Sequence, residues 1–142
     1  PKVIEFNCRF GDPEAQVILP RLRSDIVTAM LATVEGGLAD LSLHWADSQA
    51  VTVVMAAKGY PNDYEKGSVI NGIEAAGTIE NTIIFHAGTK MDDQGNVRAA
   101  GGRVLTVTGM GDDAASARET AYRAVAQIDW PDGFCRSDIA AS

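Results

Sequence analysis

Two oxygen-bearing side chains near the start of the chain, Glu5 and Asn7, have the types and spacing of metal ligands. Apolar and polar residues alternate from Val3 to Arg9, which predicts a strand. Successive side chains of a strand point to opposite faces, so Glu5 and Asn7 would share one face. A carboxylate and a carboxamide are hard oxygen donors of the kind that magnesium takes beside nucleotide phosphates. The pattern therefore indicates a nucleotide and metal site, and the alternative is an edge strand with a solvated polar face.

The residues after this strand are suited to bring a cation to the same face. Gly11 permits a tight turn. The next three residues, Asp12, Pro13 and Glu14, suit the N-cap and the first turn of a helix. A strand, a turn and a helix would then meet beside Arg9, whose guanidinium group suits a carboxylate or a phosphate. The alternative is an ordinary capped turn with Arg9 in a surface ion pair.

Five segments of the chain carry a family resemblance. Residues 3–16 resemble the signature of the glycinamide ribonucleotide synthetase family, the phosphoribosylamine-glycine ligases of the ATP-grasp superfamily. The core of that signature, Arg-Phe-Gly-Asp-Pro-Glu-x-Gln, stands here as residues 9–16 without mismatch. Four further blocks follow in the family's order: Ala56–Pro61, Phe85–Thr89, Gly101–Leu105 and Phe134–Ile139.

The resemblance implies that the chain is the C-terminal third of a longer ligase. Residues 1–37 would be the last strand and helix of the ATP-grasp catalytic module, and residues 38–142 would be the C-terminal domain. In this family ATP phosphorylates the carboxylate of glycine, and the amine of 5-phosphoribosylamine attacks the acyl phosphate. The products are glycinamide ribonucleotide, ADP and phosphate, a step of purine biosynthesis. Because the missing N-terminal part of the same enzyme would complete the site, we expect this chain alone to be inactive.

The resemblance also implies residue roles. The candidate residues are Glu5 and Asn7 for Mg²⁺ or Mn²⁺, Arg9 and Asp12 for catalysis, and Gly101, Gly102, Arg103 and His86 for substrate binding. Arg9 and Asp12 would stabilise the acyl phosphate and orient the amine or glycine. The Gly-Gly-Arg segment combines a flexible turn, free backbone donors and a guanidinium group, which together suit the phosphate of the sugar. Its alternative is a hairpin turn with a solvated arginine.

Composition excludes several classes of function. The 142 residues carry a net charge of −7, so no general attraction to nucleic acid is expected. No apolar run approaches the ~18 residues that span a bilayer, so we expect a soluble protein without a membrane partner. Cys8 and Cys135 lack the spacing of a metal or redox pair, which predicts free thiols in a reducing cytoplasm.

Hydrophobic periodicity predicts the helices. A first helix would run from Pro13 to Leu19 and kink or restart at Pro20. A second would run from Leu22 to Val34, with its apolar stripe in the core, and stop at Gly36-Gly37. A third, alanine-rich helix is expected over residues 114–128.

The strands indicate an α+β fold. We expect strands at residues 50–57, 82–89 and 103–108 in one sheet, and a short strand at 68–73 interrupted by Asn71-Gly72. Short strands joined by tight turns, such as the polar tip at residues 90–96, are typical of an antiparallel sheet or small barrel. The expected architecture is a barrel-like antiparallel domain packed by the last helix.

Two motifs suggest other functions. Gly109-Met110-Gly111 before a helix imitates the start of a dinucleotide-binding turn, but the third glycine is absent and Asp112-Asp113 would repel a pyrophosphate. Capping of the helix by the aspartates is the better interpretation. Lys90 beside Met91 at a hairpin tip is similar to the modified lysine of biotinyl and lipoyl carrier domains. A non-enzymatic carrier or binding module is therefore the alternative function.

Overall fold

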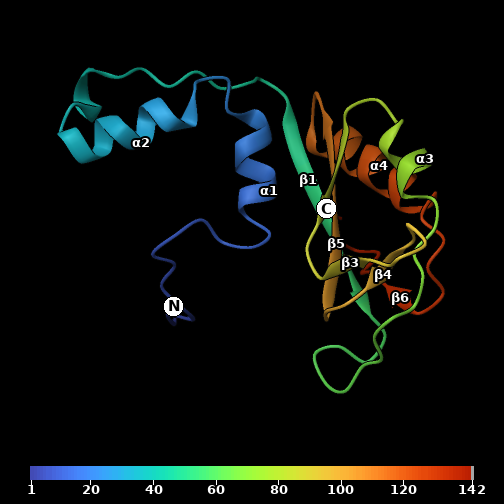
Figure 1. Cartoon of the computed structure of the whole chain (residues 1–142). Helices are drawn as coiled ribbons and strands as arrows, with labels where there is room; N and C mark the ends of the chain where they lie inside the picture. Colours follow the sequence, from blue (N-terminus) through green and yellow to red (C-terminus); the bar gives the residue numbers. More distant parts are fainter. Residues whose placement is uncertain (142) are drawn as a thin grey trace.

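The computed structural model describes residues 1–141, and its centre is a four-stranded sheet (Figure 1). The strands lie in the order β2-β5-β1-β6, and every neighbouring pair is antiparallel. Their bounds are Gln49–Ala57 for β1, Thr82–His86 for β2, Arg103–Gly111 for β5 and Gly133–Phe134 for β6. The prediction that the three main strands share one antiparallel sheet is confirmed.

Helices and one hairpin surround this sheet. The helices are α1 (Ala15–Ile18), η1 (Leu19–Arg21), α2 (Ile26–Glu35), η2 (Leu38–Asp40), α3 (Ile73–Gly77) and α4 (Ala114–Val125). The hairpin pairs β3 (Thr89–Met91) with β4 (Val97–Ala99) as a separate two-stranded sheet. The α+β class and the polar hairpin tip are therefore confirmed.

The predicted barrel is wrong, because β2 and β6 are the two edges of an open sheet in residues 1–141. Residues 68–73, which we expected to be a strand, make only isolated bridges at Val69 and Asn71. Gly72 has a φ of 79° and leads directly into α3, a helix that the sequence reading missed. Residues 68–73 therefore add no strand to the sheet.

Helix α4 covers one face of the sheet at very short range. Its buried residues are alanines, Ala117, Ala121 and Ala124. On the facing strand, a Cβ built on Gly109 would lie 2.3 Å from the backbone nitrogen of Ala121, and one on Gly111 would lie 2.6 Å from the backbone nitrogen of Ala117. The two glycines that imitated a nucleotide-binding turn thus serve helix packing.

The start of α4 confirms the capping interpretation. The Asp113 carboxylate accepts a hydrogen bond from the backbone N–H of Ser116 at 2.7 Å, and the Ser116 hydroxyl lies 3.1 Å from the backbone nitrogen of Asp113. This reciprocal pair is a capping box. The pKa of the Asp113 carboxyl is lowered, chiefly by the Ser116 backbone hydrogen bond.

The predicted strand at the N-terminus is wrong in this chain. Residues 1–10 form no strand, and their side chains are exposed. A strand needs a partner backbone, and no ladder in residues 1–141 includes this segment. The first helix also begins later than expected, at Ala15, because Asp12 does not cap it.

The predicted core stripe of α2 is also wrong. The helix starts at an Asp25 cap and ends at Gly36, which has a φ of 78°, so its stop was predicted correctly. Only Ala29 is buried, however, and Met30 and Val34 are 51% and 86% exposed. Figure 1 shows why, since α2 stands apart from the sheet, on the other side from α4.

Cys8 and Cys135 are both free thiols, as predicted. Burial raises the pKa of the Cys135 thiol. None of the helices in residues 1–141 is both long and apolar enough to cross a bilayer.

We predict that Gly109→Ala destabilises the fold by about 1–3 kcal/mol, because the new methyl group would meet the α4 backbone. Gly77→Ala is the matched control, since a Cβ at Gly77 meets nothing within 4 Å. Urea unfolding of both variants measures the difference. Equal stability of the two variants would contradict the close packing of α4.

We also predict that the stability of the β3–β4 hairpin depends on pH. The Asp92 carboxylate accepts hydrogen bonds from the Asn96 and Gln94 backbone N–H groups at 2.8 and 3.0 Å and pairs with Arg98 at 2.6 Å. These bonds, that of Asn96 foremost, lower the pKa of Asp92 from 3.8 to about 2. Because the folded-state pKa is lowered, the stabilisation is complete above pH 3.8 and is lost as the pH falls through 2.

Amide protection in β3 and β4, measured by hydrogen exchange, should therefore fall across that pH range. Asp92→Asn should lower the protection already at neutral pH. Asp93→Asn, which changes an exposed neighbour, is the control and should leave it unchanged. Unchanged protection in Asp92→Asn would show that the carboxylate does not hold the hairpin.

Candidate functional site

A polar cavity of about 480 Å³ lies between the N-terminal segment and the start of β5. It is lined by Glu5, Asn7, Arg9, Gly11, Asp12, Pro13, Glu14 and Arg103. The structure thus brings both predicted metal ligands, both predicted catalytic residues and Arg103 to one place, although the strand expected to present them is absent.

The side chains at the N-terminal end of this cavity form a hydrogen-bonded row. The Asn7 amide donates to the Glu5 carboxylate at 2.9 Å. The Arg9 guanidinium group donates to the Asn7 side-chain oxygen and, at 3.0 Å, to the carbonyl of Phe10. The chain bends at Cys8 and Arg9, so the row forms without a strand.

Glu5 and Asn7 fit a partial magnesium site. They supply a carboxylate and a carboxamide oxygen to the same cavity. Residues 1–141 contain no group of three His, Cys, Asp or Glu side chains that would hold a metal unaided. Magnesium usually takes one or two protein ligands and completes its shell with water and phosphate oxygens, so two ligands suffice for the proposed use.

A turn replaces the expected N-cap at Asp12. The Glu14 carboxylate accepts a hydrogen bond from the Gly11 backbone N–H at 2.9 Å, and the Ala15 N–H donates to the Gly11 carbonyl at 2.9 Å. The Asp12 carboxylate is instead paired with Arg103, 91 positions away in the sequence. Neither side chain is buried, with 36% of Arg103 and 49% of Asp12 exposed.

A β-bulge turns Arg103 towards this cavity. In the β1–β5 ladder Met55 pairs with Leu105, but Ala56 pairs with Arg103, so Val104 has no partner of its own. Without this extra residue, Arg103 would share the α4-facing side of Leu105. The bulge instead moves it to the opposite face, as bulges often re-aim a side chain.

The same face of β5 holds α1. The Thr108 hydroxyl donates a hydrogen bond to the Gln16 carbonyl at 3.0 Å and lies 2.7 Å from the Thr52 hydroxyl of β1. Thr108 and Arg103 therefore both attach the beginning of the chain to β5. Arg103 and its partner Asp12 line the polar cavity.

Gly101 and Gly102 serve close packing. A Cβ on Gly102 would lie 2.3 Å from the ring of Tyr60, and one on Gly101 would lie 3.1 Å from the Cα of Gly88. The Gly101 N–H donates to the Gly88 carbonyl at 3.1 Å. The expectation that this backbone donor is free for an anion is therefore wrong for Gly101.

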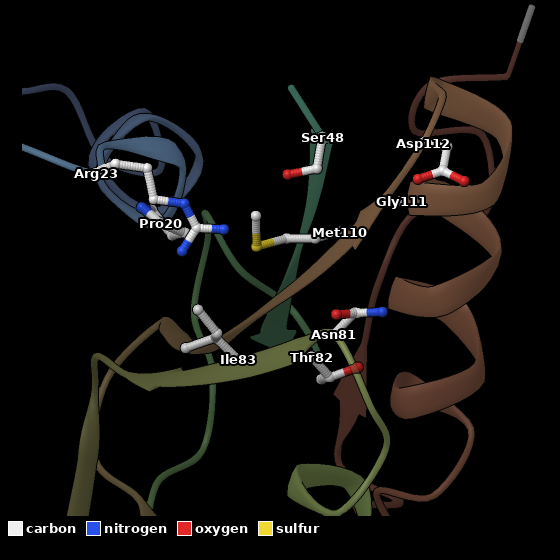
Figure 2. A pocket seen from close by; sticks show the side chains of 9 residues that line it. All are labelled: Pro20, Arg23, Ser48, Asn81, Thr82, Ile83, Met110, Gly111 and Asp112. Carbon is white, nitrogen blue, oxygen red and sulfur yellow. The ribbon is translucent and has the colours of Figure 1, made fainter. Parts of the chain in front are cut away.

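His86 lies elsewhere. It pairs with Leu105 in the β2–β5 ladder, on the α4-facing side, and its ring nitrogen lies 3.0 Å from the Thr89 hydroxyl. His86, which we expected to bind substrate together with Arg103, therefore lines neither of the cavities that Arg103 lines. A cavity of about 450 Å³ at the other end of the sheet, where Arg23 and Met110 point towards one another, contains none of the predicted site residues (Figure 2).

A further cavity, of about 400 Å³, was missed by the sequence reading. It is lined by Pro13, Thr52, Val54, Ala56, Tyr60, Arg103, Phe134, Arg136 and Ile139. The sequence of residues 134–142 has neither helical nor strand periodicity, so its pattern indicates no site. The one available signal was the resemblance of the block Phe134–Ile139 to the family.

The family model for the phosphoribosylglycinamide synthetase C domain matches residues 50–142. Among curated relatives, the chain is 54% identical over 140 residues to a chloroplastic phosphoribosylamine-glycine ligase of Arabidopsis thaliana, covering 98% of this chain and 26% of the relative. It is 50% identical over 139 residues to the phosphoribosylamine-glycine ligase of Escherichia coli O157:H7, covering 98% and 32%.

A solved structure agrees with this match. The crystal structure of a phosphoribosylamine-glycine ligase from Thermotoga maritima superposes with a TM-score of 0.78 at 35% identity, covering 98% of this chain and 33% of that chain. The chain thus spans between a quarter and a third of the length of these relatives. Sequence and fold together place it in one family: the chain belongs to the phosphoribosylglycinamide synthetase C domain family.

Proposed function

We propose that the chain is part of an ATP-dependent ligase that joins glycine to 5-phosphoribosylamine. The observation that carries this proposal is the gathering of Glu5, Asn7, Arg9, Asp12 and Arg103 around one polar cavity. The names of the relatives, phosphoribosylamine-glycine ligases, supply the reaction. Residues 1–37 would complete the catalytic module and residues 38–142 would be the C-terminal domain. A ligase family gives no support to the carrier alternative for Lys90.

The reaction needs charge stabilisation and positioning. The γ-phosphoryl group of ATP passes to the glycine carboxylate, giving ADP and an acyl phosphate. The amine of 5-phosphoribosylamine then attacks the acyl carbon, phosphate leaves, and the amine loses a proton. Arg9 would stabilise the negative charge of the acyl phosphate through its guanidinium donors. The Asp12 carboxylate would accept a hydrogen bond from the amine and orient it.

Magnesium or manganese fits the two N-terminal ligands. We propose that the Glu5 carboxylate and the Asn7 amide oxygen hold the ion in the complete enzyme. When bound, the ion neutralises the charge of the nucleotide phosphates. The Asn7 oxygen, which accepts a hydrogen bond from Arg9 in this structure, would be a ligand of the ion, and the Arg9 guanidinium group would then be available to the acyl phosphate. The cytoplasm remains the proposed location, although the Arabidopsis relative is named chloroplastic.

Arg103 is the proposed ligand of the sugar phosphate. It lies at the start of β5, beside the β-bulge, and lines the same polar cavity as Asp12. Gly101 and Gly102 would support it by letting Tyr60 and Gly88 pack against the turn. His86 is left out of this proposal because it lies on the opposite face of the sheet.

We predict that Glu5→Gln in the full-length ligase lowers kcat at limiting magnesium by at least tenfold, because an ion ligand loses its charge. High magnesium should restore part of the activity. Glu119→Gln, which removes an exposed carboxylate from α4, is the matched control and should behave as wild type. Wild-type turnover of Glu5→Gln at limiting magnesium would dismiss the metal assignment.

We predict that Arg103→Ala raises the Michaelis constant for 5-phosphoribosylamine and leaves those for ATP and glycine nearly unchanged. An exposed ion pair contributes about 0–1 kcal/mol, so loss of the Asp12 contact should not unfold the protein. Steady-state kinetics with each substrate varied in turn gives the three constants. A fall in kcat with all three constants unchanged would instead make Arg103 a positioning residue that acts through Asp12.

A further inference from the structure

The cavity of about 400 Å³ has an apolar floor on the face of the sheet opposite α4. The floor consists of alternate residues of β1, Thr52, Val54 and Ala56, whereas Val51, Val53 and Met55 are buried on the α4 side. Two aromatic side chains, Tyr60 and Phe134, line it and remain 36% and 41% exposed. A concave surface with partly exposed aromatic rings and a few polar groups has the composition of a ligand site.

Two guanidinium groups line this cavity. Arg103 pairs with Asp12 through one of its terminal nitrogens. Arg136 donates to both carboxylate oxygens of Asp138, at 2.9 and 2.7 Å. A guanidinium group has five N–H donors, so both arginines retain donors for a ligand. Because the two carboxylates balance the two cations, recognition here depends on directed hydrogen bonds more than on net charge.

Helix α4 fixes the segment that carries Arg136. The Tyr122 hydroxyl donates to the Arg136 carbonyl at 2.6 Å and accepts from the Ile139 N–H at 3.2 Å. Arg118 donates to the carbonyls of Ser137 and Ile139 at 2.7 and 2.9 Å. These bonds hold the backbone on both sides of Asp138. The Arg136 side chain is 68% exposed, so the backbone is fixed while the guanidinium group remains accessible.

We infer that this cavity binds the ribose 5-phosphate portion of the amine substrate, with Arg136 acting beside Arg103 as a second ligand of the phosphate. The inference rests on the proposed ligase function for its substrate. The apolar floor and the two rings suit the C–H faces of a sugar. The carboxylates of Asp12 and Asp138 accept hydrogen bonds from hydroxyl groups, and two guanidinium forks suit a phosphate dianion.

The position of the cavity agrees with this role. Arg103 and Pro13 line both this cavity and the polar one that holds Glu5, Asn7 and Arg9. A sugar phosphate seated on β1 would therefore lie next to the residues proposed for phosphoryl and amide chemistry. Four of the five segments that resemble the family contribute to the lining of this cavity. They do so through Pro13, Ala56, Tyr60, Arg103 and residues of 134–139.

The test uses the full-length ligase and the stable probe ribose 5-phosphate, titrated by calorimetry in saturating ADP so that the nucleotide site is filled. Arg136→Ala should weaken the binding of ribose 5-phosphate at least tenfold and raise the Michaelis constant for 5-phosphoribosylamine. Val54→Phe, which fills the floor, should have the same effect. Arg123→Ala, an exposed arginine of α4, is the matched control and should bind the probe as wild type.

The arms of the experiment separate the possible ligands. Ribose and inorganic phosphate alone should each bind more weakly than ribose 5-phosphate, since each uses half of the cavity. Equal binding of the probe by wild type and Arg136→Ala, or no binding by wild type, overturns the inference. So does a loss of ADP affinity in Arg136→Ala, which would make this a nucleotide site.

The outcome also distinguishes the inference from the proposed function. An active full-length ligase whose Arg136→Ala variant keeps its Michaelis constant for 5-phosphoribosylamine overturns the inference and leaves the function standing. Arg136-dependent binding of ribose 5-phosphate by a full-length protein without ligase activity supports the cavity and removes the function. Circular dichroism and thermal melting of each variant show that the fold is intact.

Discussion

The near-contact of α4 with the backbone of β5 is the constraint on which the rest of the structure depends. Gly109 and Gly111 allow Ala117 and Ala121 to lie against the strand, so the helix leaves no room for larger side chains there. The face of β1 and β5 that meets α4 is therefore used for packing. A charged side chain on that face would be buried without a partner, at a cost of several kcal/mol. Arg103, in the same strand, must leave that face, and the bulge beside Ala56 is how it does so.

The residues proposed for the site consequently lie on the opposite face. The N-terminal turn reaches it through Asp12, the main sheet through Arg103, and the C-terminal segment through Arg136. These attachments are individually weak, because an exposed ion pair contributes about 0–1 kcal/mol and a hydrogen bond about 0.5–1.5 kcal/mol. The rigid part of the site is thus the sheet, and the N-terminal segment is its most loosely held wall.

Sequence patterns correctly predicted the strands and the helix that follow from local periodicity. They did not predict features that depend on contacts with segments distant in the sequence. The strand of Val53, the strand of Leu105 and the helix of Ala121 were predicted because burial imposes a period of two or 3.6 residues. The same logic wrongly predicted a strand at Val3–Arg9 and a buried stripe on α2, because an alternating or striped pattern shows which face is apolar and not whether another element covers it. The guanidinium group that suggested a role for Arg103 was readable from the sequence, but the bulge that turns it depends on the register with β1. The position of Arg136 could not be predicted from periodicity, because side chains of α4 hold its backbone and no regular β-ladder does.

The strand order has a consequence for synthesis of the protein. Strand β1 ends at Ala57, and its partners are β5, which ends at Gly111, and β6, which follows at Gly133. At a translation rate of about 5–20 residues per second, β1 waits roughly 3–11 s before β5 is complete. During that time Val51, Val53 and Val54 form an uncharged, β-prone segment of the kind that pairs with other chains. The nascent chain is therefore most vulnerable to aggregation in the interval between these two strands, long before any substrate matters.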